Sequence, residues 1–196
     1  MAELGALADA MPERWRALVL LAAWCELRRG ELLALRRGDL DLLHGTVRVD
    51  RTYAHKEDGR VVQGPPNPGR PTYSRDPAAH PAGSHCSPGH LRGAERGALL
   101  FTVVKGGPLR PHVFNVRWSA ARIAVGVPHV HLHDLRHAGN TWTAATGAST
   151  AKLMARLGDA NPGAALRYQH ATADRDRVLA EALSSFAEPA PYEVWR

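Results

Sequence analysis

The sequence predicts a mainly α-helical domain that carries a small antiparallel β-sheet. Apolar residues recur with the period of a helix in both halves of the 196-residue chain. Between these regions, two short runs alternate apolar and polar residues on either side of a turn, which is the pattern of a β-hairpin. A chain of this length can form one domain with a hydrophobic core.

The first half of the chain begins with two predicted helices. Residues 12–27 have helical periodicity, with Pro12 in the first turn and an apolar face made of Trp15, Leu18, Leu21, Ala22 and Cys25. A second helix is expected over residues 30–37, "GELLALRR", and should end near Gly38.

The predicted sheet follows these helices. The runs "TVRVDRTY" at residues 46–53 and "RVVQ" at residues 60–63 alternate apolar and polar residues, and they flank the turn-like "EDG". We expect the two runs to pair as a β-hairpin. A further short strand is expected at residues 98–102, "ALLFT".

The second half of the chain is predicted to be helical again, over residues 111–125, 133–146, 149–157, 162–169 and 172–187. Gly147 should close the second of these helices, and Ser149 should cap the third, which ends at Gly158. The last helix has an apolar stripe that can pack within the domain or against a neighbouring copy, formed by Val178, Leu179 and Leu183.

Composition and charge narrow the class of protein. Hydrophobic residues make up 44% of the chain and charged residues 22%, which is typical of a folded protein and excludes wholesale disorder. The net charge of +6 favours a polyanionic partner, most often nucleic acid. The apolar run at residues 15–25 is too short to span a bilayer. With only Cys25 and Cys86 and no signal-peptide pattern, we expect a soluble cytoplasmic protein without a membrane partner.

Residues 64–93 do not fit the predicted domain. They contain seven Pro and five Gly, and Leu91 is their only Leu, Ile or Val. A structureless loop of this length is uncommon inside a compact domain. One interpretation is a genuine flexible insertion. Another is a zinc loop, although its ligand spacing fits no common structural zinc site, through His80, His85, Cys86 and His90.

The run "HLHDLRHAGNTW" at residues 131–142 concentrates cationic and hydrogen-bonding side chains. His133 and Arg136 are three residues apart, so on a helix they share a face and can reach one target together. Imidazole can carry a proton near neutral pH, and a guanidinium can bind two phosphate oxygens. For an isolated motif of this kind, the alternative is that His133 and Asp134 only cap the helix while Arg136 is solvated.

Two more residues extend this chemistry. Arg28 stands directly before a predicted helix, where backbone N–H groups favour an anion, and Tyr168 lies in the predicted helix at residues 162–169. Together with His133 and Arg136 they form a set suited to phosphoryl transfer. The tyrosine would attack, the arginines would neutralise the developing charge, and the histidine would move protons. Such a reaction requires no metal and no other cofactor, and none is expected.

Four runs resemble the motifs of the tyrosine recombinases, the phage integrase family, and actinobacterial integrases in particular. They are "LRRGELLALRRGDLDL" (27–42), "HDLRHAGNTWTAATGAS" (133–149), "LMARLGD" (153–159) and "ALRYQHA" (165–171), in the order and at the spacing of the family. The resemblance implies the α-rich recombinase catalytic-domain fold over residues 1–187, interrupted by residues 64–93 and followed by a tail at 188–196.

The resemblance also implies a function. Arg28, His133 and Arg136 would be catalytic, and Tyr168 would form a 3′-phosphotyrosyl bond during site-specific DNA recombination and integration. The partner would be double-stranded DNA, bound by a homo-oligomer in the bacterial nucleoid. Lys56, Lys105 and Arg110 are further candidates for DNA contacts.

Three departures from the family bear on activity. Asn67 stands where related integrases have a lysine that protonates the leaving oxygen, and Lys56 is the nearest substitute upstream. Asp159 stands where the family has His or Trp, and its carboxylate would repel the phosphate by roughly 1–4 kcal/mol at about 4 Å. The N-terminal core-binding domain of the family is expected to be absent. We therefore expect impaired strand cleavage, and the alternative function is that of a non-catalytic DNA-binding remnant.

The loss of the lysine has a further interpretation. The Pro, Gly, Arg, His and Ser content of residues 64–93 is what a GC-rich gene yields when it is translated in a shifted frame. A pair of compensating frameshifts would replace most of this segment together with the lysine. This hypothesis and the genuine insertion both remain open on the sequence.

Overall fold

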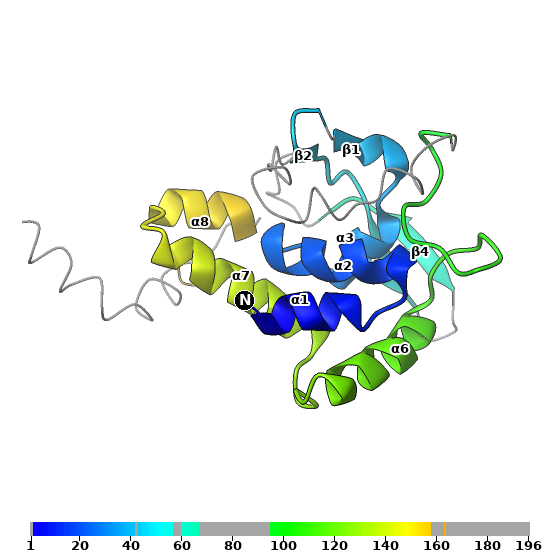
Figure 1. The fold of residues 1–196 in the computed structure, drawn as a ribbon. Coiled ribbons are helices and arrows are strands. Elements are labelled where there is room, and N and C mark those ends of the chain that lie inside the picture. Colours follow the sequence, from blue (N-terminus) through cyan, green and yellow to red (C-terminus); the bar gives the residue numbers. More distant parts are fainter. Residues whose placement is uncertain (1, 42, 57–59, 67–94, 158–162, 164–196) are drawn as a thin grey trace, which may run out of the picture.

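The computed structural model describes residues 2–41, 43–56, 60–66, 95–157 and 163 (Figure 1). Over these ranges the fold is mainly helical with two small pairs of antiparallel strands, as predicted. The helices are α1 (Ala2–Asp9), α2 (Glu13–Trp24), α3 (Arg29–Ala34), α6 (Pro111–Ala124), α7 (Leu132–Ala145) and α8 (Thr150–Leu157). The helices predicted at 162–169 and 172–187, residues 67–94 and the tail at 188–196 lie outside the described residues, apart from residue 163.

Helix α2 forms the centre of the helical core. Its predicted apolar face, from Trp15 to Cys25, is buried. The helix ends at Trp24 rather than at residue 27, because Glu26 has a φ of 52°, which a helix cannot contain. Helix α1, which the sequence analysis did not predict, packs against α2 and buries its leucines.

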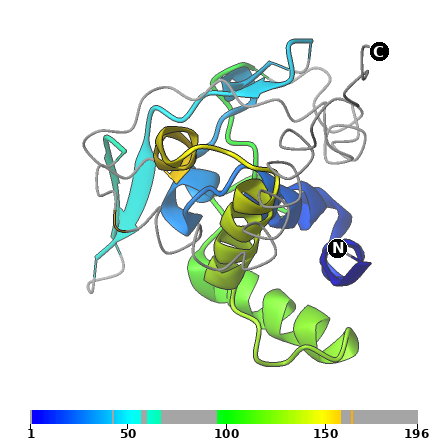
Figure 2. The same cartoon turned by 90° about the vertical axis from the view of Figure 1, so that its left-hand side faces the viewer.

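Trp15 joins α2 to the second half of the chain. Its indole Nε1 donates a hydrogen bond to the carbonyl oxygen of Thr102 at 2.9 Å. Its ring lies 6.4 Å from that of Phe114 on α6, and Phe114 lies 6.0 Å from Trp118 between ring centroids. Figures 1 and 2 both show α6 on the opposite side of α2 from strands β1 and β2. The hydrophobic core therefore combines both halves of the sequence.

Helix α3 is shorter than predicted. It ends at Ala34 because Leu35 is extended, with φ −61° and ψ 139°, and a short 3-10 turn, Arg37–Asp39, follows. Gly30 lies so close to the next strand pair that an added Cβ would be 2.5 Å from the carbonyl oxygen of Tyr53. Only glycine fits this contact, so α3 lies directly against the strand that contains Tyr53.

The predicted hairpin is only partly correct. Strand β3 (Thr52–His55) pairs with β4 (Val61–Gly64), with Thr52 opposite Gly64. The start of the predicted run instead forms β2 (Thr46–Val47), which pairs with β1 (Leu40–Asp41). The run divides between these two pairs: the backbone N–H of Arg48 still donates to the Asp39 carbonyl at 2.8 Å, and the guanidinium of Arg51 contacts the buried Asp39 carboxylate at 2.5 Å.

The prediction of a strand at residues 98–102 is wrong. This segment makes only isolated bridges, between Leu99 and Arg36 and between Thr102 and Pro108. Its neighbours are Leu35, which follows α3, and the 3-10 turn. The N–H of Leu100 donates to the Leu35 carbonyl at 2.8 Å, and the N–H of Arg37 donates to the Ala98 carbonyl at 3.0 Å. A partner that is not itself a strand cannot continue a ladder.

Helices α7 and α8 follow the prediction closely. Helix α7 packs on α2, with the rings of Trp24 and Trp142 5.1 Å apart. Gly147 closes it with a φ of 86°, and the Oγ of Ser149 accepts from the backbone N–H of Lys152 at 3.3 Å at the start of α8. Figure 2 views α8 end-on, beside α7. No helix in the described ranges has the length and apolar character needed to cross a lipid bilayer.

Candidate functional site

Arg28 lies at the start of α3, as predicted. It is the N-cap residue, with φ −72° and ψ 152°, and its backbone N–H donates to the Glu31 carboxylate at 2.8 Å. Its guanidinium lies 3.6 Å from the same carboxylate, and the side chain is 30% exposed. Glu31, 2% exposed, thus fixes both the backbone and the side chain of an arginine that still reaches the surface.

Arg136 is buried rather than solvated. It is 4% exposed on α7, and its Nη1 donates to the carbonyl oxygen of Glu26. Asn140, one turn later and fully buried, donates from its side chain to the Arg136 carbonyl at 2.8 Å. Since Glu26 precedes Arg28 by two residues, this bond brings the two predicted arginines to the same place in the fold.

Glu26 adopts a conformation that is costly for a glutamate. Its φ of 52° lies in the left-handed region, which costs a non-glycine residue about 1–2 kcal/mol. The residue is fully buried. The sharp turn that it makes after α2 directs its carbonyl group to Arg136 and leads the chain into Arg28.

His133 lies in the first turn of α7, beside the two arginines. Its ring meets that of His137 edge-on, with centroids 4.6 Å apart and planes at 87°. Partial desolvation lowers the pKa of His133 below its usual 6.5, and the electrostatic influence of His137, Arg136 and Arg28 lowers it further, while Asp134 opposes them. The neutral imidazole is therefore favoured at neutral pH, and it can accept a proton.

The start of α7 tests the alternative interpretation, in which His133 and Asp134 only cap the helix and Arg136 is solvated. The carboxylate of Asp134 accepts from the backbone N–H of His131 at 2.7 Å, so Asp134 does cap the helix. His133 does not act as the N-cap, which is His131, and Arg136 is not solvated. The motif thus combines a helix cap with two side chains that face other parts of the site.

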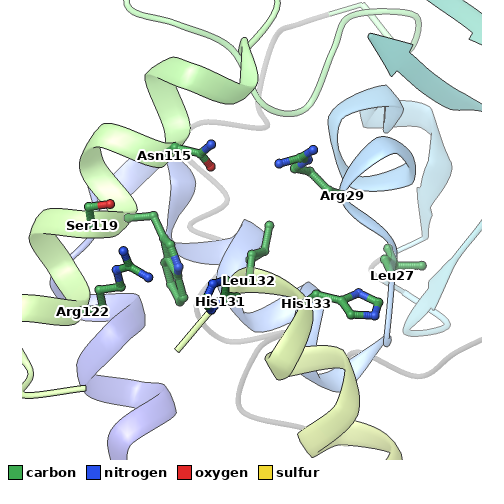
Figure 3. A pocket seen from close by; sticks show the side chains of 9 residues that line it. Leu27, Arg29, Asn115, Ser119, Arg122, His131, Leu132 and His133 are labelled. Atoms are coloured by element: carbon green, nitrogen blue, oxygen red, sulfur yellow. The ribbon is translucent and has the colours of Figure 1, made fainter. Parts of the chain in front are cut away.

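A pocket of about 500 Å³ opens next to His133 (Figure 3). Its lining comes from the start of α3, from α6 and from the start of α7, and consists of Leu27, Arg29, Asn115, Trp118, Ser119, Arg122, His131, Leu132 and His133. Figure 3 shows Arg29 and Asn115 on facing sides of this pocket. Arg122 and Trp118 both donate to the Val130 carbonyl, at 3.3 and 3.2 Å.

The contribution of α6 to this pocket was not predicted from the sequence. Asn115, Ser119 and Arg122 are spaced four and three residues apart, so they share one face of the helix. That polar face was the available signal. Arg29 was overlooked because Arg28 beside it carried the family motif.

Three predicted DNA contacts lie elsewhere. Lys56 is exposed directly after β3, where its N–H donates to the Arg60 carbonyl at 2.9 Å. Lys105 is exposed in the turn that a 2.9 Å hydrogen bond from Val103 to Gly107 closes, and Arg110 is the exposed N-cap of α6. None of the three lines the pocket beside His133. The role of Lys56 as a substitute for the lysine that the family has at position 67 remains a prediction.

Tyr168, Asn67 and Asp159 lie outside the described residues. The four residues of the alternative zinc-loop interpretation, His80, His85, Cys86 and His90, do so too. Within the part of the chain that is described, no three His, Cys, Asp or Glu side chains gather in a way that could hold a metal ion.

Among known protein families, the chain matches the "Phage integrase family" over residues 2–175. The prophage phiRv2 integrase of Mycobacterium tuberculosis H37Rv is 43% identical over 195 residues, which cover 95% of this chain and 50% of that protein. The integrase of Mycobacterium phage L5 is 33% identical over 193 residues, covering 95% and 51%. The chain thus spans about half the length of these relatives.

Solved structures share the same fold. The Tn1549 transposon integrase, in complex with transposon right end DNA, superposes with a TM-score of 0.68 at 18% identity, over 87% of this chain and 59% of that one. The XerA recombinase gives a TM-score of 0.64 at 18% identity, over 96% and 62%. At this identity the likeness concerns the arrangement of helices and strands.

Proposed function

We propose that this chain, which belongs to the phage integrase family, cleaves and rejoins DNA strands in site-specific recombination. Its fold is that of the tyrosine recombinase catalytic domains, as the resemblance of the sequence implied. The observation that carries the proposal is the hydrogen bond from Arg136 to the Glu26 carbonyl, which holds Arg136 close to Arg28 and His133. Two guanidinium groups and a neutral imidazole that lie close together suit a scissile phosphate.

The chemistry would proceed through a phosphotyrosine. The phenolic oxygen of Tyr168 attacks the phosphorus, the bond to the 5′-oxygen breaks, and a 3′-phosphotyrosyl bond forms. His133, held neutral by its surroundings, is suited to take up the phenolic proton. His133, once protonated, can pass this proton to the leaving 5′-oxygen. Attack of a 5′-hydroxyl on the phosphotyrosine reverses the sequence and rejoins a strand. Because the phosphotyrosyl bond preserves the phosphodiester energy, rejoining the strand requires no energy source such as ATP.

Double-stranded DNA is the proposed partner. The net charge of +6 favours it, and the pocket beside His133 adds Arg29 and Arg122 to the arginines of the site. The Tn1549 integrase, a structural neighbour, is described in complex with DNA. Assembly of several copies on DNA, and a place in the bacterial nucleoid, follow from the same proposal.

Asn67 and Asp159 favour a second candidate, a DNA-binding remnant without cleavage activity. The resemblance places a lysine and a His or Trp at these positions, and neither is present. Phosphate contacts by arginine do not depend on them, so binding can persist where chemistry is weak. Wild-type cleavage is therefore expected to be weak.

Nicked duplexes with randomised sequence around the nick test the proposal, because loss of the short fragment traps the covalent adduct on a denaturing gel. We expect little adduct from the wild-type chain and a clear adduct from the Asn67→Lys, Asp159→His double variant. Adding Tyr168→Phe to that variant should abolish the adduct. Salt-dependent duplex binding with no adduct from any variant would instead establish the DNA-binding remnant.

A further inference from the structure

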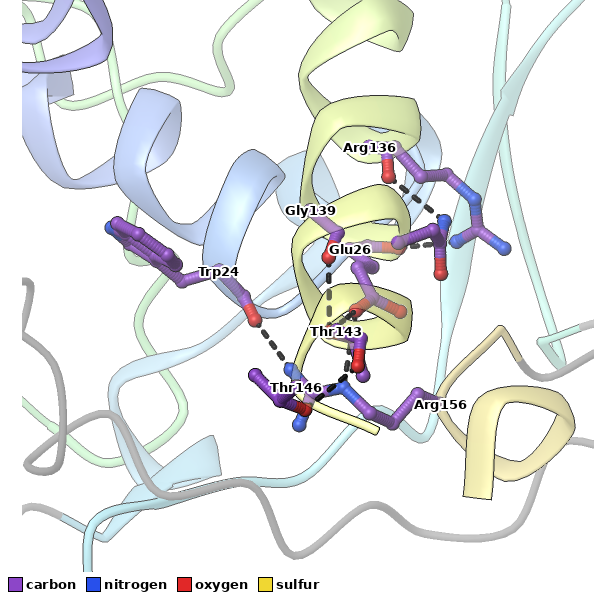
Figure 4. A network of polar contacts seen from close by, with 8 residues as sticks. Trp24, Glu26, Arg136, Gly139, Thr143, Thr146 and Arg156 are labelled. Atoms are coloured by element: carbon purple, nitrogen blue, oxygen red, sulfur yellow. Dashed lines mark hydrogen bonds and ion pairs between the residues drawn. The ribbon is translucent and has the colours of Figure 1, made fainter. Parts of the chain in front are cut away.

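Glu26 directly follows α2, and its buried side chain contacts both α7 and α8 (Figure 4). The proposed chemistry assigns no role to this side chain. Its Oε1 accepts from the hydroxyl of Thr143 on α7 at 3.0 Å and from Nε of Arg156 on α8 at 3.0 Å. Glu26 is fully buried, whereas the Arg156 side chain is 32% exposed. The carboxylate therefore forms an ion pair at the inner end of an arginine that reaches in from α8.

Arg156 uses a second nitrogen on a neighbouring acceptor, at the end of α2. Its Nη2 donates to the carbonyl oxygen of Trp24, the last residue of α2, at 2.9 Å. A guanidinium at a helix C-terminus satisfies a free carbonyl and complements the helix dipole. Two bonds at fixed spacing hold α8 against the end of α2 in one orientation, which a single-point contact would not do.

The backbone of Glu26 acts on the predicted site at the same time. Its carbonyl oxygen accepts from Arg136, and Arg28 follows two residues later. In the sequence, α8 ends at Leu157 and is followed by Asp159 and Tyr168. Glu26 thus contacts both Arg136, which is predicted to bind the phosphate, and α8, which precedes the predicted nucleophile Tyr168 in the sequence.

We propose that Glu26 and Arg156 form a latch that fixes α8 to the turn before Arg28 and so positions the segment that leads to Tyr168. The inference rests on the proposed strand cleavage for its catalytic consequence. Glu26 and Arg156 are positioning residues in this scheme, because neither touches the phosphate; they act through Arg136 and through α8.

Amide hydrogen exchange of the full chain, bound to a mixed-sequence duplex, tests the latch without requiring cleavage. In Glu26→Gln and in Arg156→Met, peptides that cover residues 150–157 should exchange about tenfold faster than in the wild type, while those of α6 stay unchanged. Arg156→Lys, which keeps the charge but cannot reach both acceptors, should fall between. Unchanged exchange in α8 in both variants would overturn the proposal.

Arg16→Met is the matched control. Arg16 pairs with Asp9 at 2.6 Å and is 30% exposed, which is close to the exposure of Arg156, but it joins α1 to α2. Its loss should leave exchange in α8 at the wild-type rate. Faster exchange in α8 of this control would attribute the effect to general loosening and would sink the latch.

The rate of adduct formation on the nicked duplexes tests the catalytic consequence, in the Asn67→Lys, Asp159→His background. Adding Glu26→Gln or Arg156→Met should slow adduct formation about tenfold, with duplex affinity changed less than about threefold. Equal rates would refute the positioning role even if cleavage occurs. If no parent protein forms an adduct, the proposed cleavage fails, and exchange in α8 alone decides the latch.

Discussion

Gly139 of α7 lies directly against the carbonyl group of Ala23 in α2, so that a Cβ at this position would overlap the carbonyl oxygen. The same Cβ would lie 3.1 Å from the Cγ of Glu26. The contact brings α7 close enough for Arg136 to bond to the Glu26 carbonyl. The geometry of the candidate site therefore depends on a glycine that has no chemistry of its own.

Gly139→Ala should destabilise the protein by about 1–3 kcal/mol, because backbone and side-chain atoms must shift to admit the methyl group. Urea unfolding followed by circular dichroism measures the change. Gly5→Ala in α1 is the control, since nothing lies within 4 Å of a Cβ there. It should stabilise by about 0.5–1 kcal/mol, as alanine does in a helix. Equal midpoints for the two variants would contradict the close α2–α7 contact.

The pKa of His133 should lie below 6.5 in the folded protein, because burial and the charges of His137, Arg136 and Arg28 disfavour its protonated form. NMR titration of labelled histidine, with the signal assigned through His133→Gln, measures it directly. His137→Gln should raise the pKa of His133, since it removes one of these charges. A wild-type value at or above 6.5 would contradict the structure of the site.

The same shift predicts a pH dependence of stability. The folded state binds a proton at His133 less readily than the unfolded chain does, so this group stabilises the fold above its unfolded pKa of about 6.5. The contribution is lost as the pH falls from there through the folded pKa. The free energy of unfolding of the wild type should therefore drop more steeply than that of His133→Gln over this range, by urea titration at several pH values.

Arg136→Met should destabilise the protein by about 1–3 kcal/mol, because it leaves the Glu26 carbonyl buried without this donor. Arg136→Lys keeps a charge and should lose less. Thermal or urea unfolding of the three proteins gives the comparison. A fully stable Arg136→Met variant would show that the bond to Glu26 does not hold α7 in place.

Arg29→Gln should weaken duplex binding and reduce the slope of log K against log salt by about 0.9 if Arg29 contacts one phosphate. Arg14→Gln changes the charge equally, and Arg14 is exposed over the ring of Trp15 rather than in the pocket. Its slope should match that of the wild type. Fluorescence anisotropy at a series of salt concentrations distinguishes the two. Identical slopes for both variants would exclude the pocket from the DNA surface.

Among the described residues, most helices follow their predictions, whereas the strand predictions are only partly correct, for a physical reason. The period of apolar residues and the caps at Gly147 and Ser149 act within a few residues, so they can be read locally. Strand pairing depends on a partner elsewhere in the chain, and the start of the predicted hairpin pairs with β1, which was not predicted as a strand. Helix α1 was not predicted, although its buried residues Leu4 and Leu7 have the three-residue spacing of a helix face.

For the site, the sequence by itself determined which residue types are present and the order of the motifs that contain Arg28, His133 and Arg136. It also determined the family to which the chain belongs. Only the tertiary structure decided that Arg136 is buried against Glu26, 110 positions away in the chain, and that α6 lines the pocket. A bond between residues so far apart leaves no periodicity in the sequence, because it is formed only when separate helices pack together.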